Sequence, residues 1–274
     1  MEKIDFTYAS KAEHNFAQRL LIKTIENITG KRKLEKLYKN YSPGNDGSIN
    51  FWSDILKIMD IGVKNKSSEP LSFPKKGPLL VIANHPFGII DGLILCSLIS
   101  SRRSDFKIIT HETLKFLPQL EKYILPVDFS DKKEAKIINI ETSKKAITHL
   151  KDQGALIIFP AGGVSTAKNL KSAAEDDDWK LFPAKLIHQT KPKILPIYFE
   201  GKNGLLFHIF ATKLKSQTLK YSTYIHETKK KIGKDIIIFS GKVINYKEIS
   251  HIKDRKKLTE FLKEHIYSLK NSNT

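Results

Sequence analysis

Hydrophobic and polar positions divide the chain into an N-terminal part with helical spacing and a longer part built of short apolar runs. Between Lys11 and Tyr38, apolar residues recur near every 3.6 positions, which predicts helix with a stop at Gly30. The turn-rich stretch 42–48 then precedes a short helical segment at 51–59. We expect residues 1–60 to form an N-terminal helical cap and residues 61–274 to form the main domain.

Short continuous apolar runs dominate the main domain. LLVIA, ALIIF and DIIIF have no polar alternation, which is typical of central strands covered on both faces. The expected strands are Leu79–Ala83, Phe106–Ile109, Ala155–Phe159, Lys193–Tyr198 and Asp235–Phe239. The expected helices are Ile89–Ser101, Asp131–Gln153, Asp177–Gln189 and Asp254–Leu269, with one more between Leu205 and Lys231. This alternation predicts an α/β fold, with a mainly parallel central sheet covered by helices on both faces.

The N-terminal helices have a second interpretation. An amphipathic helix can lie at a membrane interface, and here Phe16, Leu20 and Trp52 would face lipid. A helix that simply covers the core is the commoner use of such a pattern. Both interpretations predict a helix and differ only in what its apolar face contacts.

The charge balance is strongly basic, with 47 Lys and Arg against 29 Asp and Glu and a formal charge of +18. Such a surface attracts nucleic acid, anionic lipid or an acidic carrier protein. The single cysteine, Cys96, lies in an apolar run, so we expect it buried in a helix of a protein from a reducing compartment. The sequence shows neither a spanning apolar stretch nor a secretory signal, which favours a cytoplasmic protein, free or on a membrane surface.

The stretch NHPFGIIDG follows the first predicted strand of the main domain. His85 would emerge at the carboxyl end of that strand, where open α/β sheets bind ligands. Asp91 would lie in the first turn of the next helix, from which its carboxylate can reach back to the imidazole. A carboxylate on one ring nitrogen leaves the other free to accept a proton, which is what a general base requires. A purely structural His–Asp pair is the alternative.

The stretch FPAGGVS follows a second predicted strand. Gly162 and Gly163 allow backbone N–H groups to point at an oxyanion or a phosphate, although the same residues also make an ordinary turn. Lys168 and Lys171 add positive charge nearby. The acidic run EDDDW, Glu175 to Trp179, is interpreted as a loop and helix start rather than a metal site.

No nucleophile elbow, metal-ligand spacing or dinucleotide fingerprint accompanies these two stretches. A base without a protein nucleophile suggests that it activates a hydroxyl group of the substrate itself.

NHPFGIIDG, FPAGGVS and ILPIYFEGKN, in this order, resemble the blocks of the glycerolipid acyltransferase family, which transfers acyl chains to lysophospholipids and similar acceptors. The resemblance implies His85 as base, Asp91 as its orienting carboxylate, and no metal. It also implies substrate-binding roles for Asn84, Phe87, Phe159, Gly162, Gly163, Ser165 and Lys168. The resemblance extends over roughly residues 60–245.

Three positions depart from the family pattern. Five residues separate His85 from Asp91 where the family has four, so the Pro-Phe-Gly turn must absorb one. Ala161 replaces a Glu, and Val164 replaces the Arg that the family uses for an acceptor phosphate. The combination is closer to the hemolysin-type branch, which includes acyltransferases of ornithine- and glycine-lipid synthesis.

This branch implies an O-acyltransferase whose acceptor is a lyso-aminolipid, an N-acylated amino acid with a free hydroxyl on its chain. The co-substrate would be a thioester of acyl carrier protein or coenzyme A, with no other cofactor. The expected surroundings are an anionic membrane surface, at the inner face of the cytoplasmic membrane. Nucleic acid is not expected as a partner.

Two rival functions stay open from the residues alone. Lysine clusters at 31–39, 227–234 and 253–257 would suit a nucleic-acid binder, although no recognised binding motif accompanies them. Ser165 could instead serve His85 and Asp91 as the nucleophile of a lipid hydrolase, although it lies outside a Gly-x-Ser-x-Gly elbow.

Overall fold

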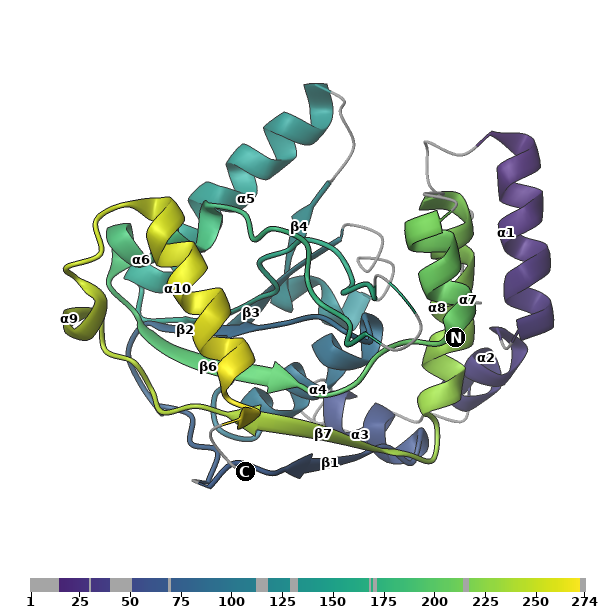
Figure 1. Cartoon of the computed structure of the whole chain (residues 1–274), viewed down its shortest axis with the longest axis horizontal. Helices are drawn as coiled ribbons and strands as arrows, with labels where there is room; N and C mark the ends of the chain where they lie inside the picture. The colour runs from purple at the N-terminus through teal and green to yellow at the C-terminus, as the bar shows by residue number, and fades with distance from the viewer. Residues whose placement is uncertain are drawn as a thin grey trace.

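A single seven-stranded sheet organises the protein (Figure 1). The computed structural model describes residues 15–29, 31–39, 51–68, 70–111, 118–128, 133–167, 169, 172–213 and 217–271. The sheet order is β1-β7-β6-β2-β5-β3-β4. The strands are β1 (Gly62–Asn65), β2 (Leu79–Ala83), β3 (Phe106–His111), β4 (Ile124–Val127), β5 (Ala155–Ile158), β6 (Lys193–Phe199) and β7 (Asp235–Ser240).

All neighbouring strands run parallel except β6 and β7, which are antiparallel. The predicted mainly parallel α/β fold is therefore confirmed, and each of the five predicted strands is present. The edge strands β1 and β4 were not predicted. Their sequences, GVKN and ILPV, are four residues long and either polar or interrupted by Pro126, which is tolerated at a sheet edge.

Side chains of each central strand alternate between two cores. In β2, Leu79 and Val81 face one core, whereas Leu80 and Ile82 face the other, and all four are fully buried. This two-sided burial explains why the strand sequence is apolar at every position. β2 lies between β5 and β6, so its carboxyl end opens near the middle of the sheet.

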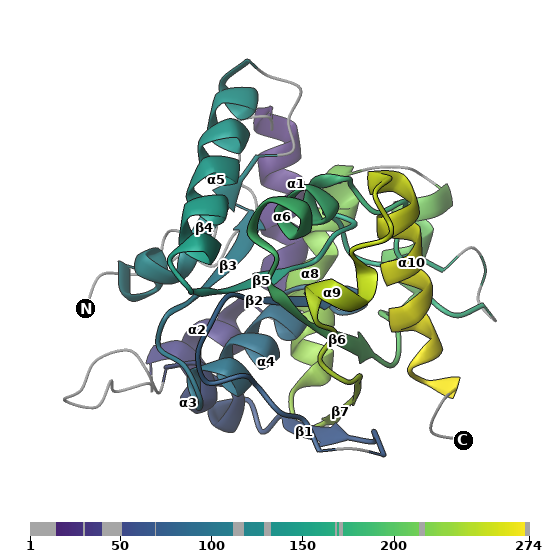
Figure 2. The same cartoon turned by 90° about the vertical axis from the view of Figure 1, so that its left-hand side faces the viewer.

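Helices cover both faces (Figures 1 and 2). One core is completed by α3 and α4, and the other by α5, α6 and α10. The helices are α1 (Phe16–Thr29), α2 (Lys31–Lys39), α3 (Phe51–Ile58), α4 (Ile89–Ser100), α5 (Lys133–Lys151), α6 (Phe182–Thr190), α7 (Leu205–His208), α8 (Gln217–Lys231), α9 (Tyr246–Ile249) and α10 (Arg255–Ser268). A 3₁₀-helix spans Pro118–Tyr123, and a π-helical turn spans Ile209–Lys213.

The first two helices pack beside α8 at one side of the molecule (Figure 1). Ile22 of α1 is fully buried, whereas Phe16 is 83% and Leu20 is 58% exposed. Trp52 does not face outward as the membrane interpretation requires. It is buried and packs edge-on against Phe106 and Tyr123.

One predicted helix start is wrong. α6 begins at Phe182 rather than Asp177, because residues 176–180 run without regular structure and bury Trp179 in the core. Cys96 is buried in α4, as predicted. Among the helices of the described ranges, none combines the length and apolar character needed to cross a bilayer.

Candidate active site

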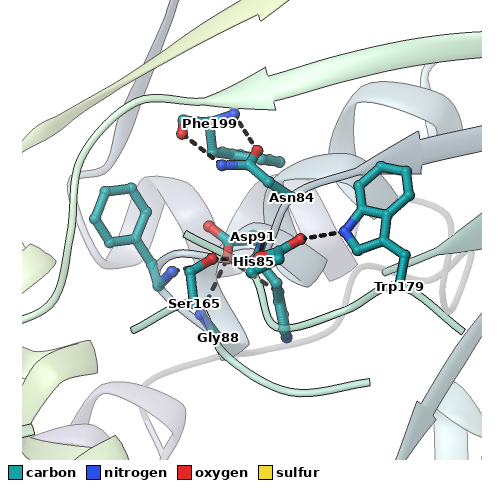
Figure 3. A network of polar contacts seen from close by, with 9 residues as sticks. Asn84, His85, Gly88, Asp91, Ser165, Trp179 and Phe199 are labelled. Carbon is teal, nitrogen blue, oxygen red and sulfur yellow. Dashed lines mark hydrogen bonds and ion pairs between the residues drawn. The ribbon is translucent and has the colours of Figure 1, made fainter. Parts of the chain in front are cut away.

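The carboxyl end of β2 is fixed to β6 by a side chain. Asn84 directly follows β2, and its amide nitrogen donates to the carbonyl of Phe199 at 3.0 Å (Figure 3). The Phe199 N–H donates back to the Asn84 amide oxygen at 2.7 Å. Asn84 is 1% exposed, so its amide holds the end of the strand at the place where His85 leaves the sheet.

His85 and Asp91 face each other across the turn. The His85 Nδ1 atom lies 3.0 Å from Asp91 Oδ2. The distance is that of a hydrogen bond, although the ring is tilted so that its N–H does not point straight at the oxygen. Gly88, with φ 76°, absorbs the additional residue of the turn, so the five-residue spacing still brings the two side chains together.

Asp91 also organises the turn around it. The same oxygen, Oδ2, accepts the backbone N–H groups of Phe87 at 2.8 Å and Gly88 at 3.0 Å. Asp91 is completely buried, and this burial raises its pKa, while His85 and the two N–H groups oppose the rise. The carboxylate is therefore held in place beside the imidazole, and its charge also interacts with the Lys231 ammonium.

The imidazole ring is supported on one face and open elsewhere. Phe159, immediately after β5, stacks on it with ring centroids 3.9 Å apart and 23° between the planes. The His85 side chain retains 18% exposure, so a group from outside can reach it. The predicted substrate-binding residue Phe159 thus lies beside the predicted base.

The FPAGGVS loop lies against His85, but its two glycines differ. The Gly162 N–H donates to the carbonyl of Phe159 at 3.1 Å and so closes a turn. The Gly163 N–H has no hydrogen-bond partner among the described residues, and a Cβ at this position would meet no atom within 4 Å. Only Gly163 therefore offers a free backbone donor and open space around it.

Ser165 is fully buried and ties the loop to the histidine. Its N–H donates to the His85 carbonyl at 2.8 Å. Its hydroxyl donates to Asp176 Oδ1 at 2.5 Å. The hydroxyl is thus engaged with a carboxylate, and the described structure contains no hydrogen bond between it and the His85 ring.

Asp176 is a second buried carboxylate of the site, which the sequence analysis missed. Its Oδ1 accepts from Ser165 and from the His85 backbone N–H at 3.2 Å, and its Oδ2 accepts the Trp179 indole N–H at 2.8 Å. Burial raises the pKa of Asp176, against the lowering effect of these bonds. In the sequence, Asp176 is one of three consecutive aspartates, and nothing in the local pattern distinguishes it from the other two.

Phe87 and Val164 close the back of the site. Phe87 is 5% exposed and packs so closely on Gly201 that a Cβ there would lie 2.6 Å from its ring. Val164, the residue in place of the family arginine, is also buried and contacts Gly88. Lys168 and Lys171 lie outside the described residues.

The part of the chain that the structure describes contains no group of three or more His, Cys, Asp or Glu side chains able to hold a metal ion. The site instead offers a partly exposed imidazole beside a buried carboxylate, and the FPAGGVS loop next to it carries a free backbone N–H at Gly163. This combination can remove a proton and stabilise developing negative charge.

The open α/β sheet carries the His–Asp pair at the carboxyl end of a central strand, where such sheets bind ligands. The profile of a family described as Acyltransferase matches residues 14–274. The chain belongs to this acyltransferase family, which confirms the prediction that it is an acyltransferase.

Two curated relatives are similar over nearly the whole chain, and both are named lyso-glycine lipid O-acyltransferase. The protein of Bacteroides thetaiotaomicron is 25% identical, over 98% of this chain and 96% of its own. That of Phocaeicola vulgatus is 23% identical, over 98% and 94%. Among solved structures, the 1-acyl-sn-glycerophosphate (LPA) acyltransferase PlsC of Thermotoga maritima matches with a TM-score of 0.45 and 16% identity, covering 95% of this chain and 84% of that one.

Proposed function

We propose that this enzyme transfers a fatty acyl chain from a thioester to the hydroxyl of a lyso-aminolipid, with His85 as the general base. The observation that carries the proposal is the 3.0 Å contact between His85 Nδ1 and a buried carboxylate, which leaves the other ring nitrogen for the substrate. The names of the two curated relatives support this class of acceptor.

The chemistry needs no group besides the two substrates. His85 takes the hydroxyl proton as the acceptor oxygen attacks the thioester carbonyl, and Asp91 stabilises the imidazolium that forms. The tetrahedral intermediate then collapses, the carbon–sulfur bond breaks, and the imidazolium returns the proton to the thiolate. The Gly163 N–H is the available oxyanion donor, and such a donor contributes about 3 kcal/mol in comparable sites.

Val164 bears on the choice of acceptor. A buried valine against Gly88 offers no charge to a phosphate, so we expect poor use of lysophosphatidate compared with a phosphate-free lyso-lipid. Turnover of both acceptors by the purified enzyme measures this preference. Equal turnover would show that another group supplies the phosphate contact.

For the donor, we propose a thioester of acyl carrier protein or coenzyme A. Both are anionic, which suits the charge of +18. Comparing the two thioesters of one fatty acid over a range of salt concentrations identifies the preferred donor.

Phe16 and Leu20 are exposed on α1, but the basic face described next offers a more specific membrane contact.

For membrane attachment, we propose the outer face of α5, whose N-terminal half projects from the body of the protein (Figures 1 and 2). Ile137 is 59% and Ile140 is 56% exposed, and helical spacing places Lys133, Lys136 and Lys144 on the same stripe. Apolar side chains flanked by lysines suit an anionic membrane. We expect the double variant I137S/I140S to lose vesicle binding, with F261S on α10 as the control, and equal loss in both would contradict this face.

The test of the central proposal uses His85→Ala, an acyl thioester and a lyso-aminolipid. We expect the rate of acyl transfer to fall by about 10²–10⁴-fold, which is the usual contribution of a general base. His251→Ala removes an exposed histidine before α10 and should leave activity unchanged. Substantial turnover by folded His85→Ala would refute the role of His85.

A further inference from the structure

One face of α8 is directed at the loop that follows β6. Tyr224, Glu227, Thr228 and Lys231 share this face by helical spacing. Tyr224 stacks on Phe207 with centroids 5.9 Å apart, and Glu227 Oε2 accepts the Gly204 N–H at 2.7 Å. Thr228 is buried and lies next to Glu227 on this side of the helix.

The backbone of this loop is held at three consecutive residues. Lys231 Nζ donates to the Lys202 carbonyl at 3.3 Å, and Glu227 accepts from Gly204. His208 Nδ1 accepts the Ala167 N–H, so its Nε2 carries the proton and donates to the Asn203 carbonyl at 3.0 Å. The position of Asn203 is therefore fixed independently of its side chain.

The side chain of Asn203 is nevertheless unused. The residue is 4% exposed, and neither the amide oxygen nor the amide nitrogen has a hydrogen-bond partner among the described residues. The buried hydroxyl of Thr228 likewise lacks a partner there. An unsatisfied buried polar group costs about 1–3 kcal/mol, so the two amide atoms of Asn203 and the hydroxyl on the facing helix indicate a missing hydrogen-bonding ligand.

Lys231 supplies a positive charge at the same corner. Its ammonium lies over the Phe87 ring, 4.0 Å from the centroid, and no carboxylate in the described structure lies within 4.0 Å of it. The neighbouring Glu227 is engaged with Gly204 and Lys230. Burial lowers the pKa of Lys231, while the charges of Glu227 and Asp91 oppose this effect, as a bound anion would too.

This corner adjoins the catalytic pair through Phe87. The N–H of Phe87 donates to Asp91, while its ring lies between Lys231 and Gly201. A ligand held at Lys231 would therefore be separated from the His–Asp pair by Phe87 alone.

We propose that Lys231, Asn203 and Thr228 form the subsite for the carboxylate of the lyso-lipid acceptor. This inference rests on the proposed function and adds the place where the headgroup is recognised. One ammonium with an amide N–H and a hydroxyl matches a planar monoanion. An N-acylated amino acid retains this carboxylate. The subsite would supply the positive charge that the family takes from an arginine, at whose position this chain has Val164.

A binding measurement tests the subsite without catalysis. The probe is N-dodecanoylglycine, which has the carboxylate but no hydroxyl to acylate, and its methyl ester is the control ligand. We expect the acid to raise the Tm of the wild-type enzyme and the ester to have little effect. Lys231→Gln should weaken binding of the acid about tenfold or more, as for a charge-assisted hydrogen bond. Lys256→Gln, in an exposed lysine of α10 that pairs with Glu260, should leave it unchanged.

Kinetics with a hydroxylated N-acylglycine and its methyl ester provide the second measurement. We expect Lys231→Gln and Asn203→Asp to raise KM for the acid, to change kcat little, and to leave the ester unaffected. Equal binding and equal KM of acid and ester in the wild-type enzyme would overturn the subsite, even if acyl transfer occurs. Carboxylate-dependent binding without transfer to any acceptor would instead support the subsite and overturn the proposed function.

Discussion

Two buried carboxylates contact His85, one at its imidazole ring and the other at its backbone N–H. Asp91 meets the imidazole at 3.0 Å, whereas Asp176 accepts the His85 backbone N–H at 3.2 Å. Asp91 lies six positions from the histidine, on the next helix, and Asp176 lies 91 positions away in a loop without regular structure. One carboxylate is placed to respond to charge on the ring, and the other joins the loop of Ser165 to the backbone of the base.

This difference separates an electrostatic role from a positioning role. Asp91 has the imidazole as a neighbour whose charge changes during the proposed reaction. Asp176 accepts hydrogen bonds from three uncharged donors, Ser165, Trp179 and the His85 backbone, and the imidazole charge affects its pKa less than any of these bonds does. Removing the charge at the two positions should therefore have unequal consequences.

The largest effect is expected for Asp91→Asn. The amide keeps the size of the side chain but cannot stabilise the imidazolium, so kcat should fall by about 10³–10⁴-fold. Steady-state acyl transfer measures the loss, and Tm at neutral pH checks the fold. A loss of less than tenfold would assign Asp91 the structural role of a helix cap.

A smaller effect is expected for Asp176→Asn. An amide offers one acceptor oxygen in place of two, so the contacts with Ser165, Trp179 and the His85 backbone cannot all survive. Displacement of the base should lower kcat by roughly 10–100-fold with little change in KM. Asp178→Asn, an exposed neighbour, is the matched control. A lower Tm with full activity would make Asp176 important for stability alone.

The two aspartates also show what the sequence could predict about the site. His85 and Asp91 were predictable because strand, turn and helix lie within one short stretch and determine where both side chains point. Asp176 was not predictable, because it reaches His85 only when the chain folds back after 91 positions. No local sequence pattern encodes that contact. Three adjacent aspartates look alike in sequence, and only burial distinguishes the first, Asp176, from the other two.

Ser165→Ala should have a milder effect still. The hydroxyl donates to Asp176, so its removal should cost about 1 kcal/mol of stability and reduce turnover less than tenfold. Thermal unfolding and acyl transfer measure the two quantities. Complete loss of turnover in a folded variant would favour the rival hydrolase, with Ser165 as its nucleophile.

The smallest effect concerns stability and pH. Burial raises the pKa of Asp91 above its ordinary value of 3.8, so its ionisation begins to destabilise the folded state as the pH rises past 3.8, and the full cost is reached above the raised value. Asp91→Asn removes this cost, and its Tm relative to wild type should be higher at pH 7 than at pH 4, by roughly 2–4 °C per kcal/mol. The same difference at both pH values would show that the folded protein does not raise this pKa.

The fold, like the site, was predictable from the sequence in some parts and not in others. The five central strands were predictable because burial on both faces makes them apolar throughout. The reversed direction of β7 was not, because an apolar run such as DIIIF does not encode its direction. Likewise, Asp177 and Asp178 are typical of a helix start, but burial of Trp179 keeps this segment extended.

The central claim is that His85 activates the acceptor hydroxyl directly, without an acyl-enzyme. The most direct measurement is thiol release when the purified enzyme receives an acyl thioester and no acceptor, followed by the mass of the intact protein. We predict no burst of thiol and no added acyl mass until the lyso-lipid is present. A stoichiometric burst with a covalent acyl group, absent in Ser165→Ala, would contradict the account.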